Sequence, residues 1–228
     1  MSTPAPASRP FLIGIAGGSG SGKSRVAATI CAWLAPDALV LPQDCYYRDH
    51  ADLSAEQRSR LNYDEPLALD HALLQQHLQR LSCGQGIERP HYDFSRHRRR
   101  EQREPVVPAA VIIVEGLFAW WDEAVRGQFD LRLFVDAAPD LRFIRRLRRD
   151  VEERGRTIES VIRQYLETVR PMHDRWIEPA RAQAHVVLIN SGAWEETAHR
   201  LNQNLAARLP VSLAERLTFR NVPSNPDH

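Results

Sequence analysis

One segment of the sequence has the glycines, lysine and serine of a phosphate-binding loop at the required spacing. Apolar residues over 11–16 run directly into a G-x-x-x-x-G-K-S pattern that ends at Ser24, and a segment with helical periodicity follows. Glycines let successive backbone N–H groups converge on phosphate oxygens, and the helix directs its positive N-terminal end at the same place. The pattern therefore predicts a nucleotide-binding loop formed by Gly17, Gly18, Ser19, Gly20, Ser21, Gly22, Lys23 and Ser24.

Two side chains of this loop have positions that would act on the phosphates themselves. Lys23 would bridge the β- and γ-phosphates, and the Ser24 hydroxyl would bind a Mg²⁺ ion that neutralises charge during transfer. A glycine-rich turn with an incidental lysine is the alternative, but the strand before it and the helix after it favour a phosphate-binding loop. The pattern leaves open whether the phosphoryl group goes to water, to a protein switch state or to a small hydroxyl substrate.

Two carboxylates follow apolar runs of strand length. Glu115 ends the run 111–114, and Asp44 lies just beyond the run 38–41. Because an open α/β sheet binds ligands at the carboxyl ends of its strands, Glu115 is a candidate ligand of Mg²⁺ or its water. Asp44 is a candidate base that orients the attacking hydroxyl and accepts its proton late. A solvated strand-end charge for Glu115 and a helix-capping role for Asp44 are the alternatives.

Aromatic rings and hydrogen-bonding groups occur together in two later clusters, 62–66 and 90–97. This mixture suits a flat heterocycle. Taken singly, Tyr63, Tyr92 and Phe94 are also typical of a core or of hairpin packing, and His97 stands in a run of arginines that is typical of an exposed surface. Neither cluster alone identifies a substrate.

Arginines are concentrated between positions 142 and 156. Four of them share one stripe at helical spacing: Arg142, Arg145, Arg146 and Arg149. Such a stripe beside a phosphate loop predicts a lid that carries arginines to the transferring group, whereas a solvated helix face is the alternative for any single one.

The elements that must position these residues alternate between strand and helix. Strands are expected over 11–16, 38–41, 111–114, 131–135 and 185–189, and helices over 24–34, 70–81, 140–151, 158–169 and 194–209. This alternation predicts an α/β fold of the P-loop NTPase type, a parallel sheet flanked by helices. A charged segment at about 87–107 is expected to form an inserted β-hairpin flap, and about 140–170 a helical lid. We expect a disordered tail over 1–10, a single domain over 11–209 and a C-terminal tail over 210–228.

Bulk properties exclude several classes of protein. The chain has 228 residues and a formal net charge of +1, so no global field favours nucleic acid or a membrane surface. Its three cysteines form no C-x-x-C pair, which argues against a disulfide framework or a zinc site and favours the cytoplasm. The longest apolar stretch, 109–121, is interrupted by Glu115 and Gly116 and is too short to span a membrane.

Taken together, these segments resemble the uridine kinase family of P-loop kinases over nearly the whole span 11–189. The resemblance is specific because the motifs occur in one order. They are 14–24, 43–47, 62–64 with Pro66 and Asp70, 92–94 with His97, 112–116, 145–156, 164–165 and 169–173.

The resemblance implies transfer of the γ-phosphate of ATP or GTP to the 5′-hydroxyl of uridine or cytidine, in pyrimidine salvage. Asp44 would be the catalytic base, and Mg²⁺ would be held by Ser24 and Glu115 with Asp44 nearby. The same matching gives roles to the remaining site residues. Asp64 and Arg146 would bind the ribose hydroxyls, and Tyr92 and His97 would bind the edge of the pyrimidine. Tyr47, Tyr63 and Phe94 would contact the faces of the pyrimidine, and Gln164 would contact the nucleoside. The phosphates would be bound by Arg149, Arg154 and Arg156. Family members are commonly homo-oligomers, often tetramers.

Three positions depart from the family pattern. Thr157 stands where an acidic residue is usual, 117–121 is bulkier than usual, and 191–194 matches the adenine-proximal loop only loosely, which leaves the donor preference open. Rival readings are a kinase acting on phosphoribulose or pantothenate, a nucleotide switch or ATPase, and an RNA-binding module that uses the arginine-rich hairpin. The chain lacks the Asn-Lys-x-Asp motif that reads guanine, and it has no Asp directly before Glu115.

Overall fold

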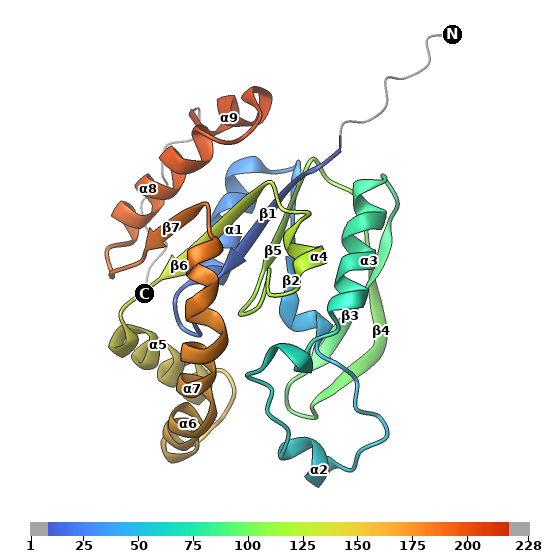
Figure 1. Cartoon of the computed structure of the whole chain (residues 1–228), viewed down its shortest axis with the longest axis vertical. Helices are drawn as coiled ribbons and strands as arrows, with labels where there is room; N and C mark the ends of the chain where they lie inside the picture. Colours follow the sequence, from blue (N-terminus) through green and yellow to red (C-terminus); the bar gives the residue numbers. More distant parts are fainter. Residues whose placement is uncertain (1–8, 219–228) are drawn as a thin grey trace.

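The computed structural model describes residues 9–218. Its centre is a five-stranded parallel sheet (Figure 1). The strands lie in the order β2 (Ala38–Pro42), β5 (Val111–Glu115), β1 (Phe11–Ala16), β6 (Leu131–Asp136) and β7 (Val186–Ile189). Each neighbouring pair is parallel, as in β1, where Leu12 pairs with Ile112. The predicted parallel sheet of the P-loop type is therefore confirmed, and the strand bounds differ from the prediction by at most one residue.

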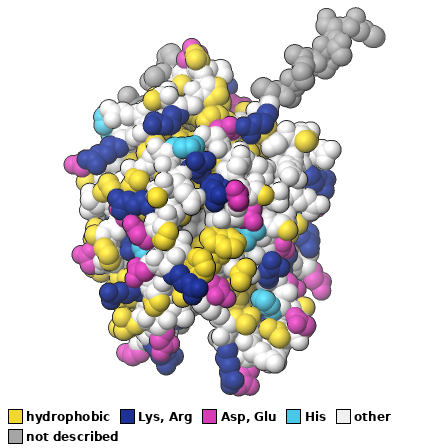
Figure 2. Space-filling view, in the orientation of Figure 1, with side chains coloured by type: hydrophobic (Ala, Val, Ile, Leu, Met, Phe, Trp, Pro, Cys, Tyr) yellow, Lys and Arg dark blue, Asp and Glu magenta, His cyan; other side chains and the backbone are white. Residues whose placement is uncertain are grey.

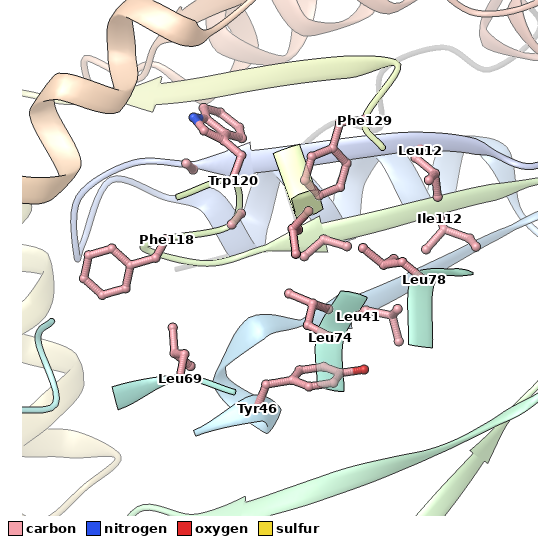
Figure 3. Packing of buried hydrophobic residues seen from close by; sticks show 14 of the residues in the cluster. Leu12, Leu41, Tyr46, Leu69, Leu74, Leu78, Ile112, Phe118, Trp120 and Phe129 are labelled. Atoms are coloured by element: carbon pink, nitrogen blue, oxygen red, sulfur yellow. The ribbon is translucent and has the colours of Figure 1, made fainter. Parts of the chain in front are cut away.

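The central strands are apolar along their whole length because both faces of the sheet are covered. On β1, Leu12 joins one buried cluster with Leu41 and Ile112, whereas Ile13 and Ile15 join a second cluster on the opposite face. Figure 3 shows the first cluster, with side chains from the strands and from the covering segments directed toward one another. Alternate residues of one strand thus serve two cores, as expected for a doubly covered parallel sheet.

Helices cover the two faces of the sheet. One face carries α1 (Lys23–Leu34), α8 (Trp194–Ala206) and α9 (Val211–Thr218), whose buried residues belong to the second cluster. The other face carries α3 (His71–Ser82) and α4 (Glu123–Arg126). Helix α3 begins where predicted, because the Asp70 side chain caps it by accepting a hydrogen bond from the Leu73 N–H.

An antiparallel hairpin, β3 (Ile87–Asp93) and β4 (Arg98–Val106), lies beside α3 at one edge of the molecule (Figure 1). Two arginines tie it to β2 and to the segment that follows β2: Arg89 donates to the Val40 carbonyl at 3.2 Å, and Arg99 donates to the Tyr47 carbonyl at 2.7 Å. The hairpin agrees with the insertion predicted at about 87–107. Shorter elements precede it in the chain, namely η1 (Gln43–Tyr46), α2 (Ala55–Ser59) and η2 (Pro66–Ala68).

The arginine-rich part of the chain is helical, as predicted, but it is not a simple pair of α-helices. It starts with α5 (Pro139–Glu152) and α6 (Ile158–Gln164). The expected helix over 158–169 then widens into a π-helix, η3 (Tyr165–Val169). The segment continues through α7 (Arg170–Met172), the π-helix η4 (His173–Ile177) and η5 (Glu178–Gln183). Pro171 explains the first widening, since proline has no N–H to donate to the preceding turn.

The prediction of a C-terminal tail over 210–228 is wrong for residues 211–218, which form α9. Leu213 and Leu217 are spaced by one helical turn and are 7% and 3% exposed, so α9 packs into the core of α1 and α8. The predicted disordered tail over 1–10 is wrong for its last two residues, because Pro10 is buried and Arg9 forms an ion pair with Asp130. Residues 1–8 and 219–228 lie outside the described residues. Within 9–218, no helix is both long enough and apolar enough to cross a bilayer.

Candidate active site

A cavity of about 1060 Å³ opens at the carboxyl ends of the sheet strands. Figure 2 shows the surface indented at its lower edge, between the parts of the molecule that carry α6 and α2 in Figure 1. Most of the predicted site residues line this one cavity. They are Ser19, Lys23, Ser24, Asp44, Tyr47, Tyr63, Asp64, Tyr92, Phe94, His97, Glu115, Arg146, Arg149, Arg154, Arg156 and Gln164. The loop residues Gly17, Gly18, Gly20, Ser21 and Gly22 are not among those that line it.

The phosphate-binding loop is curled tightly between β1 and α1. Gly20 and Gly22 have φ angles of +78° and +95°, in the left-handed region that favours glycine. A Cβ atom at Gly20 would clash with the Arg142 carbonyl oxygen, and one at Gly22 would clash with the Asn190 amide. The Lys23 ammonium donates to the Gly18 carbonyl at 3.0 Å, which holds it across the mouth of the loop. Burial lowers the pKa of Lys23, although Glu115 opposes this shift.

Asn190 holds this loop through a side-chain hydrogen bond. Sequence reasoning did not select this residue. It follows β7, is 5% exposed, and its side-chain amide donates to the Ser21 carbonyl at 2.8 Å. Its own N–H donates to the Asp136 carbonyl at 2.7 Å, which fixes the end of β7 beside that of β6. A polar residue directly after the last apolar run was the available signal.

The predicted metal ligands lie together. The Ser24 hydroxyl donates to a Glu115 carboxylate oxygen at 3.1 Å, and Asp44 faces the same cavity. Burial raises the pKa values of Glu115 and Asp44, and the Lys23 charge opposes both shifts. One hydroxyl and two carboxylates fit Mg²⁺, which takes few protein ligands and completes its shell with phosphates and water. Accordingly, the described part of the chain holds no cluster of three or more His, Cys, Asp or Glu side chains arranged for a metal.

Gln43 fixes the separation between Asp44 and Glu115. Its side chain is buried and forms two hydrogen bonds with the Phe118 backbone, donating to the carbonyl at 2.8 Å and accepting from the N–H at 2.9 Å. The segment after β2 is thereby tied to the segment after β5. Sequence reasoning treated Gln43 only as part of a motif and missed this role.

The aromatic residues form one wall of the cavity. Tyr47 lies 5.1 Å from Tyr92 and 6.0 Å from Phe94 between ring centroids. The Tyr63 ring stacks on His97 at 4.4 Å with an interplanar angle of 10°. Tyr63 therefore orients the histidine in this structure and has one face already covered.

His97 occupies the hairpin turn with a φ of +51°, which is uncommon for a residue other than glycine. Burial lowers its pKa, and the neighbouring charges of Arg58 and Arg156 lower it further. The imidazole is therefore neutral at pH 7, so one ring nitrogen can donate and the other can accept. That chemistry suits the edge of a heterocyclic base.

Asp64 is 8% exposed and accepts hydrogen bonds from α6 and η3. The Thr168 hydroxyl donates to it at 2.9 Å and the Gln164 amide at 3.5 Å. Thr168 also lines the cavity and was missed by sequence reasoning. Its spacing of four residues from Gln164 on an expected helix was the signal that could have found it.

The arginine stripe divides in the structure. Arg142 is buried outside the cavity lining and donates to the Ala137 carbonyl at 3.0 Å. Its atoms lie directly against Gly18 and Gly20, so it packs against the phosphate-binding loop. Arg146 lies within the cavity and donates to the Ser19 hydroxyl at 2.9 Å and to Gln164 at 3.0 Å.

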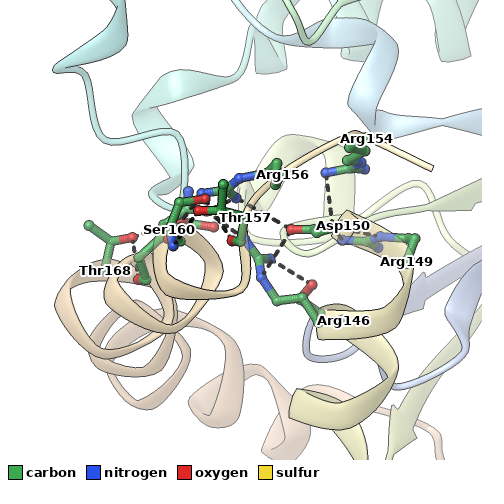
Figure 4. A network of polar contacts seen from close by, with 11 residues as sticks. Arg146, Arg149, Asp150, Arg154, Arg156, Thr157, Ser160 and Thr168 are labelled. Carbon is green, nitrogen blue, oxygen red and sulfur yellow. Dashed lines mark hydrogen bonds and ion pairs between the residues drawn. The ribbon is translucent and has the colours of Figure 1, made fainter. Parts of the chain in front are cut away.

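Asp150 joins the arginines that line the cavity (Figure 4). Its fully buried carboxylate contacts Arg146, Arg149, Arg154 and Arg156. Burial acts to raise the pKa of Asp150, but attraction by Arg146, Arg149 and Arg154 outweighs it and holds the pKa below its ordinary value.

A parallel sheet with a phosphate-binding loop, and a cavity that joins this loop to a polar and aromatic compartment, define a P-loop kinase of small molecules. The match to known proteins agrees: residues 12–197 fit the model of the phosphoribulokinase / uridine kinase family. The chain belongs to this family. It is 48% identical over 198 residues to a uridine kinase of Deinococcus deserti, covering 86% of this chain and 96% of that one.

Solved structures share the fold. A putative fructose transport system kinase from Silicibacter sp. TM1040 matches with a TM-score of 0.66 and 22% identity, over 82% of this chain and 92% of that one. A possible uridine kinase from Bacillus stearothermophilus matches with a TM-score of 0.56 and 19% identity, over 81% and 91%. At these identities the likeness concerns the fold alone.

Proposed function

We propose that the protein phosphorylates the 5′-hydroxyl of uridine and cytidine, yielding UMP and CMP, with ATP or GTP as donor. One observation carries this proposal: a single cavity is lined by Lys23 and Ser24 at one end and by Asp64, Tyr92 and His97 at the other. A phosphate-binding loop and a site for a ribose and a flat base thus share one cavity. The similarity to uridine kinases over most of the chain supports the same acceptor.

The donor end is assigned to the loop and the arginines. Lys23 would contact the β- and γ-phosphates, and Arg149, Arg154 and Arg156 would approach from α5 and the turn after it. Mg²⁺, held by Ser24 and Glu115 with Asp44 nearby, would neutralise charge on the transferring group. The raised pKa of Glu115 supports this role, because a buried carboxylate gains stability from a bound cation.

Asp44 is assigned as the base. Its carboxylate lies in the cavity, close enough to Lys23 for their charges to interact, so an acceptor hydroxyl bound beside it faces the donor phosphate. The carboxylate orients this hydroxyl and accepts its proton as the new bond forms, since a loose transition state needs positioning more than strong basicity.

At the acceptor end, the hydrogen-bonding groups and aromatic rings of the side chains suggest which part of the nucleoside each would bind. Asp64 and Arg146 would hold the ribose hydroxyls, because a buried carboxylate and a guanidinium offer an acceptor and donors for vicinal hydroxyls. Neutral His97 would donate to the uracil 4-oxo group or accept from the cytosine 4-amine, with Tyr92 at the same edge. Tyr47, Tyr63 and Phe94 would contact the base faces, and Gln164 the nucleoside.

We also propose a cytoplasmic, homo-oligomeric enzyme, a tetramer by family resemblance. Three cysteines without a disulfide, Cys31, Cys45 and Cys83, support a reducing compartment.

The test is an acceptor panel: ATP consumption with uridine, cytidine, adenosine, ribulose 5-phosphate, pantothenate or no acceptor. We expect turnover with the two pyrimidine nucleosides and little with the others. Faster turnover with ribulose 5-phosphate or pantothenate would favour the rival kinases, and equal use of adenosine would show that the base site is misassigned.

A further inference from the structure

The carboxylate of Asp150 is shared between two pairs of arginines (Figure 4). Its Oδ1 atom lies 2.8 Å from an Arg149 nitrogen and 3.6 Å from one of Arg154. Its Oδ2 atom lies 3.4 Å from an Arg156 nitrogen and 3.6 Å from one of Arg146. The Asp150 side chain is 0% exposed, so the charged groups around its carboxylate are these arginines and not solvent ions.

Asp150 does not itself reach the substrate space. The four arginines all line the cavity, whereas Asp150 is not among the residues that do. It lies behind them, on the last turn of α5, and its carbonyl accepts a hydrogen bond from the Arg156 N–H at 3.0 Å, which closes the turn after the helix. Any influence of Asp150 on the reaction must therefore pass through the arginines.

We propose that Asp150 is a positioning residue for phosphoryl transfer: a buried counter-ion that aims the four arginines at the substrates and limits how tightly they hold polyphosphate before transfer. This inference rests on the proposed function, because it requires the arginines to act on the transferring group. It assigns a role to a residue that the motif and the cavity lining leave without one.

The two carboxylate oxygens contact arginines that interact with different groups of the cavity. On the Oδ1 side, Arg149 also donates through its Nε at 3.0 Å, and its charge acts on both Asp44 and Glu115 at the transfer point. On the Oδ2 side, Arg146 and Arg156 both donate to Gln164, which in turn donates to Asp64. One carboxylate thus links the arginine that acts on Asp44 and Glu115 to the two arginines that bind Gln164.

Position matters because arginine side chains are long and have many rotamers. Ordering each of them costs conformational entropy, which a buried carboxylate offsets before the substrates bind. A guanidinium displaced by about 1 Å can cost roughly 10²-fold in rate. By holding the arginines in place, Asp150 therefore helps them to stabilise the transition state.

The negative charge of Asp150 has a second effect, because it weakens the binding of polyphosphate to the arginines in the ground state. Four guanidinium groups without a counter-ion would bind a polyphosphate more tightly in the ground state, because one negative charge beside them has been lost. Binding that is equally strong in the ground and transition states does not raise the rate. Loss of Asp150 should therefore lower kcat while leaving anion affinity the same or higher, a split that a purely structural residue would not produce.

The experiment compares Asp150→Asn, which keeps the shape and removes the charge, with Asp150→Glu, which keeps the charge and lengthens the side chain. Glu152→Gln is the matched control, since Glu152 is exposed on the same helix and outside the cavity lining. The readouts are kcat with uridine and ATP, inhibition by inorganic tripolyphosphate competing with ATP, and the temperature of unfolding.

We expect Asp150→Asn to lower kcat by about 10- to 100-fold and to bind tripolyphosphate about threefold more tightly. Asp150→Glu should lower kcat less, with tripolyphosphate inhibition unchanged, and Glu152→Gln should behave as wild type. Unchanged kcat in Asp150→Asn, or a loss of tripolyphosphate binding that parallels the loss of kcat, would overturn the proposal.

If Asp150→Asn does not fold, Asp150→Glu decides: lower kcat with unchanged inhibition supports positioning, and any other result contradicts it. A wild-type enzyme that does not phosphorylate uridine would instead refute the proposed function, and tripolyphosphate binding would still report on the arginine cluster.

Discussion

The hydroxyl of Thr168 donates a 2.9 Å hydrogen bond to the Asp64 carboxylate, although 104 residues separate them in the chain. The contact joins the helical segment 158–177 to the loop before α3 and closes one side of the cavity. The Gln164 carbonyl lies 3.1 Å from the same hydroxyl oxygen and is a second, more distant acceptor for its single proton. Asp64 is thereby held with one oxygen already engaged, which leaves the other for a substrate hydroxyl.

Replacing Thr168 by Val should impair use of ribonucleosides. The change removes one hydrogen bond to a buried carboxylate at nearly constant volume, a loss of about 1–2 kcal/mol, or roughly 5- to 30-fold in kcat/KM for uridine. Thr168→Ser keeps the hydroxyl and should stay close to wild type. Steady-state kinetics on both variants check this, and equal damage in Ser and Val variants would mean that packing, not the hydroxyl, is what matters.

The sugar should discriminate strongly. If Asp64 binds the ribose hydroxyls, 2′-deoxyuridine leaves this carboxylate without one donor, at a loss of about 2–3 kcal/mol. This corresponds to roughly 30- to 150-fold in kcat/KM relative to uridine. Asp64→Ala should compress the ratio toward unity, mainly by damaging the uridine reaction. Equal use of the two nucleosides by the intact enzyme would remove Asp64 from the ribose site.

Asp44→Asn should leave ATP binding nearly intact while lowering kcat by roughly 10²- to 10⁴-fold, because a positioned base contributes about that much. Lys23→Ala is the comparison, and it should lower both nucleotide affinity and turnover through lost charge at the phosphates. The measurements are nucleotide binding by calorimetry and single-turnover rates. Near-normal turnover in Asp44→Asn would exclude Asp44 as the base.

The same substitution should stabilise the protein without ligands. Burial raises the folded-state pKa of Asp44 above its ordinary value of 3.8, so the folded state binds the proton more tightly than the unfolded state. Stability is therefore lost as pH rises from the ordinary pKa through the folded pKa, and the loss persists at neutral pH. Asp44→Asn should then unfold at higher urea than wild type at pH 7, with the difference shrinking toward pH 4. A variant that is less stable than wild type at pH 7 would contradict the assigned cost of the buried charge.

Much of the fold and site follows from local sequence signals. The apolar runs of β1 and β5 indicate strands because both faces of the sheet are buried. The glycine spacing before Lys23 indicates the loop because residues other than glycine rarely adopt its backbone conformation. Residues at strand ends, such as Asp44 and Glu115, converge because parallel strands share one carboxyl edge. Such features depend on near neighbours in the chain.

The features that were missed depend on distant contacts. Helix α9 is only eight residues long and follows Pro210, and it is contact with α1 and α8 that buries Leu213 and Leu217. The four-residue spacing from Gln164 could have singled out Thr168, but its partner Asp64 is 104 residues away in the chain, and the local sequence does not indicate that contact. Asp150 looks like one charge in an alternating run, and its burial among four arginines emerges only when the helix meets the turn after it.

Identification of the reaction product tests whether the phosphoryl group is transferred to the 5′-hydroxyl of uridine. The enzyme is incubated with uridine, ATP and Mg²⁺, and ³¹P NMR follows the phosphorus atoms, with 5′-deoxyuridine as an acceptor that lacks the reacting hydroxyl. We expect one equivalent of uridine 5′-monophosphate for each ADP formed, and no nucleotide product from 5′-deoxyuridine. ADP formation with free phosphate in place of UMP, or phosphorylation of 5′-deoxyuridine at another hydroxyl at a comparable rate, would contradict this expectation.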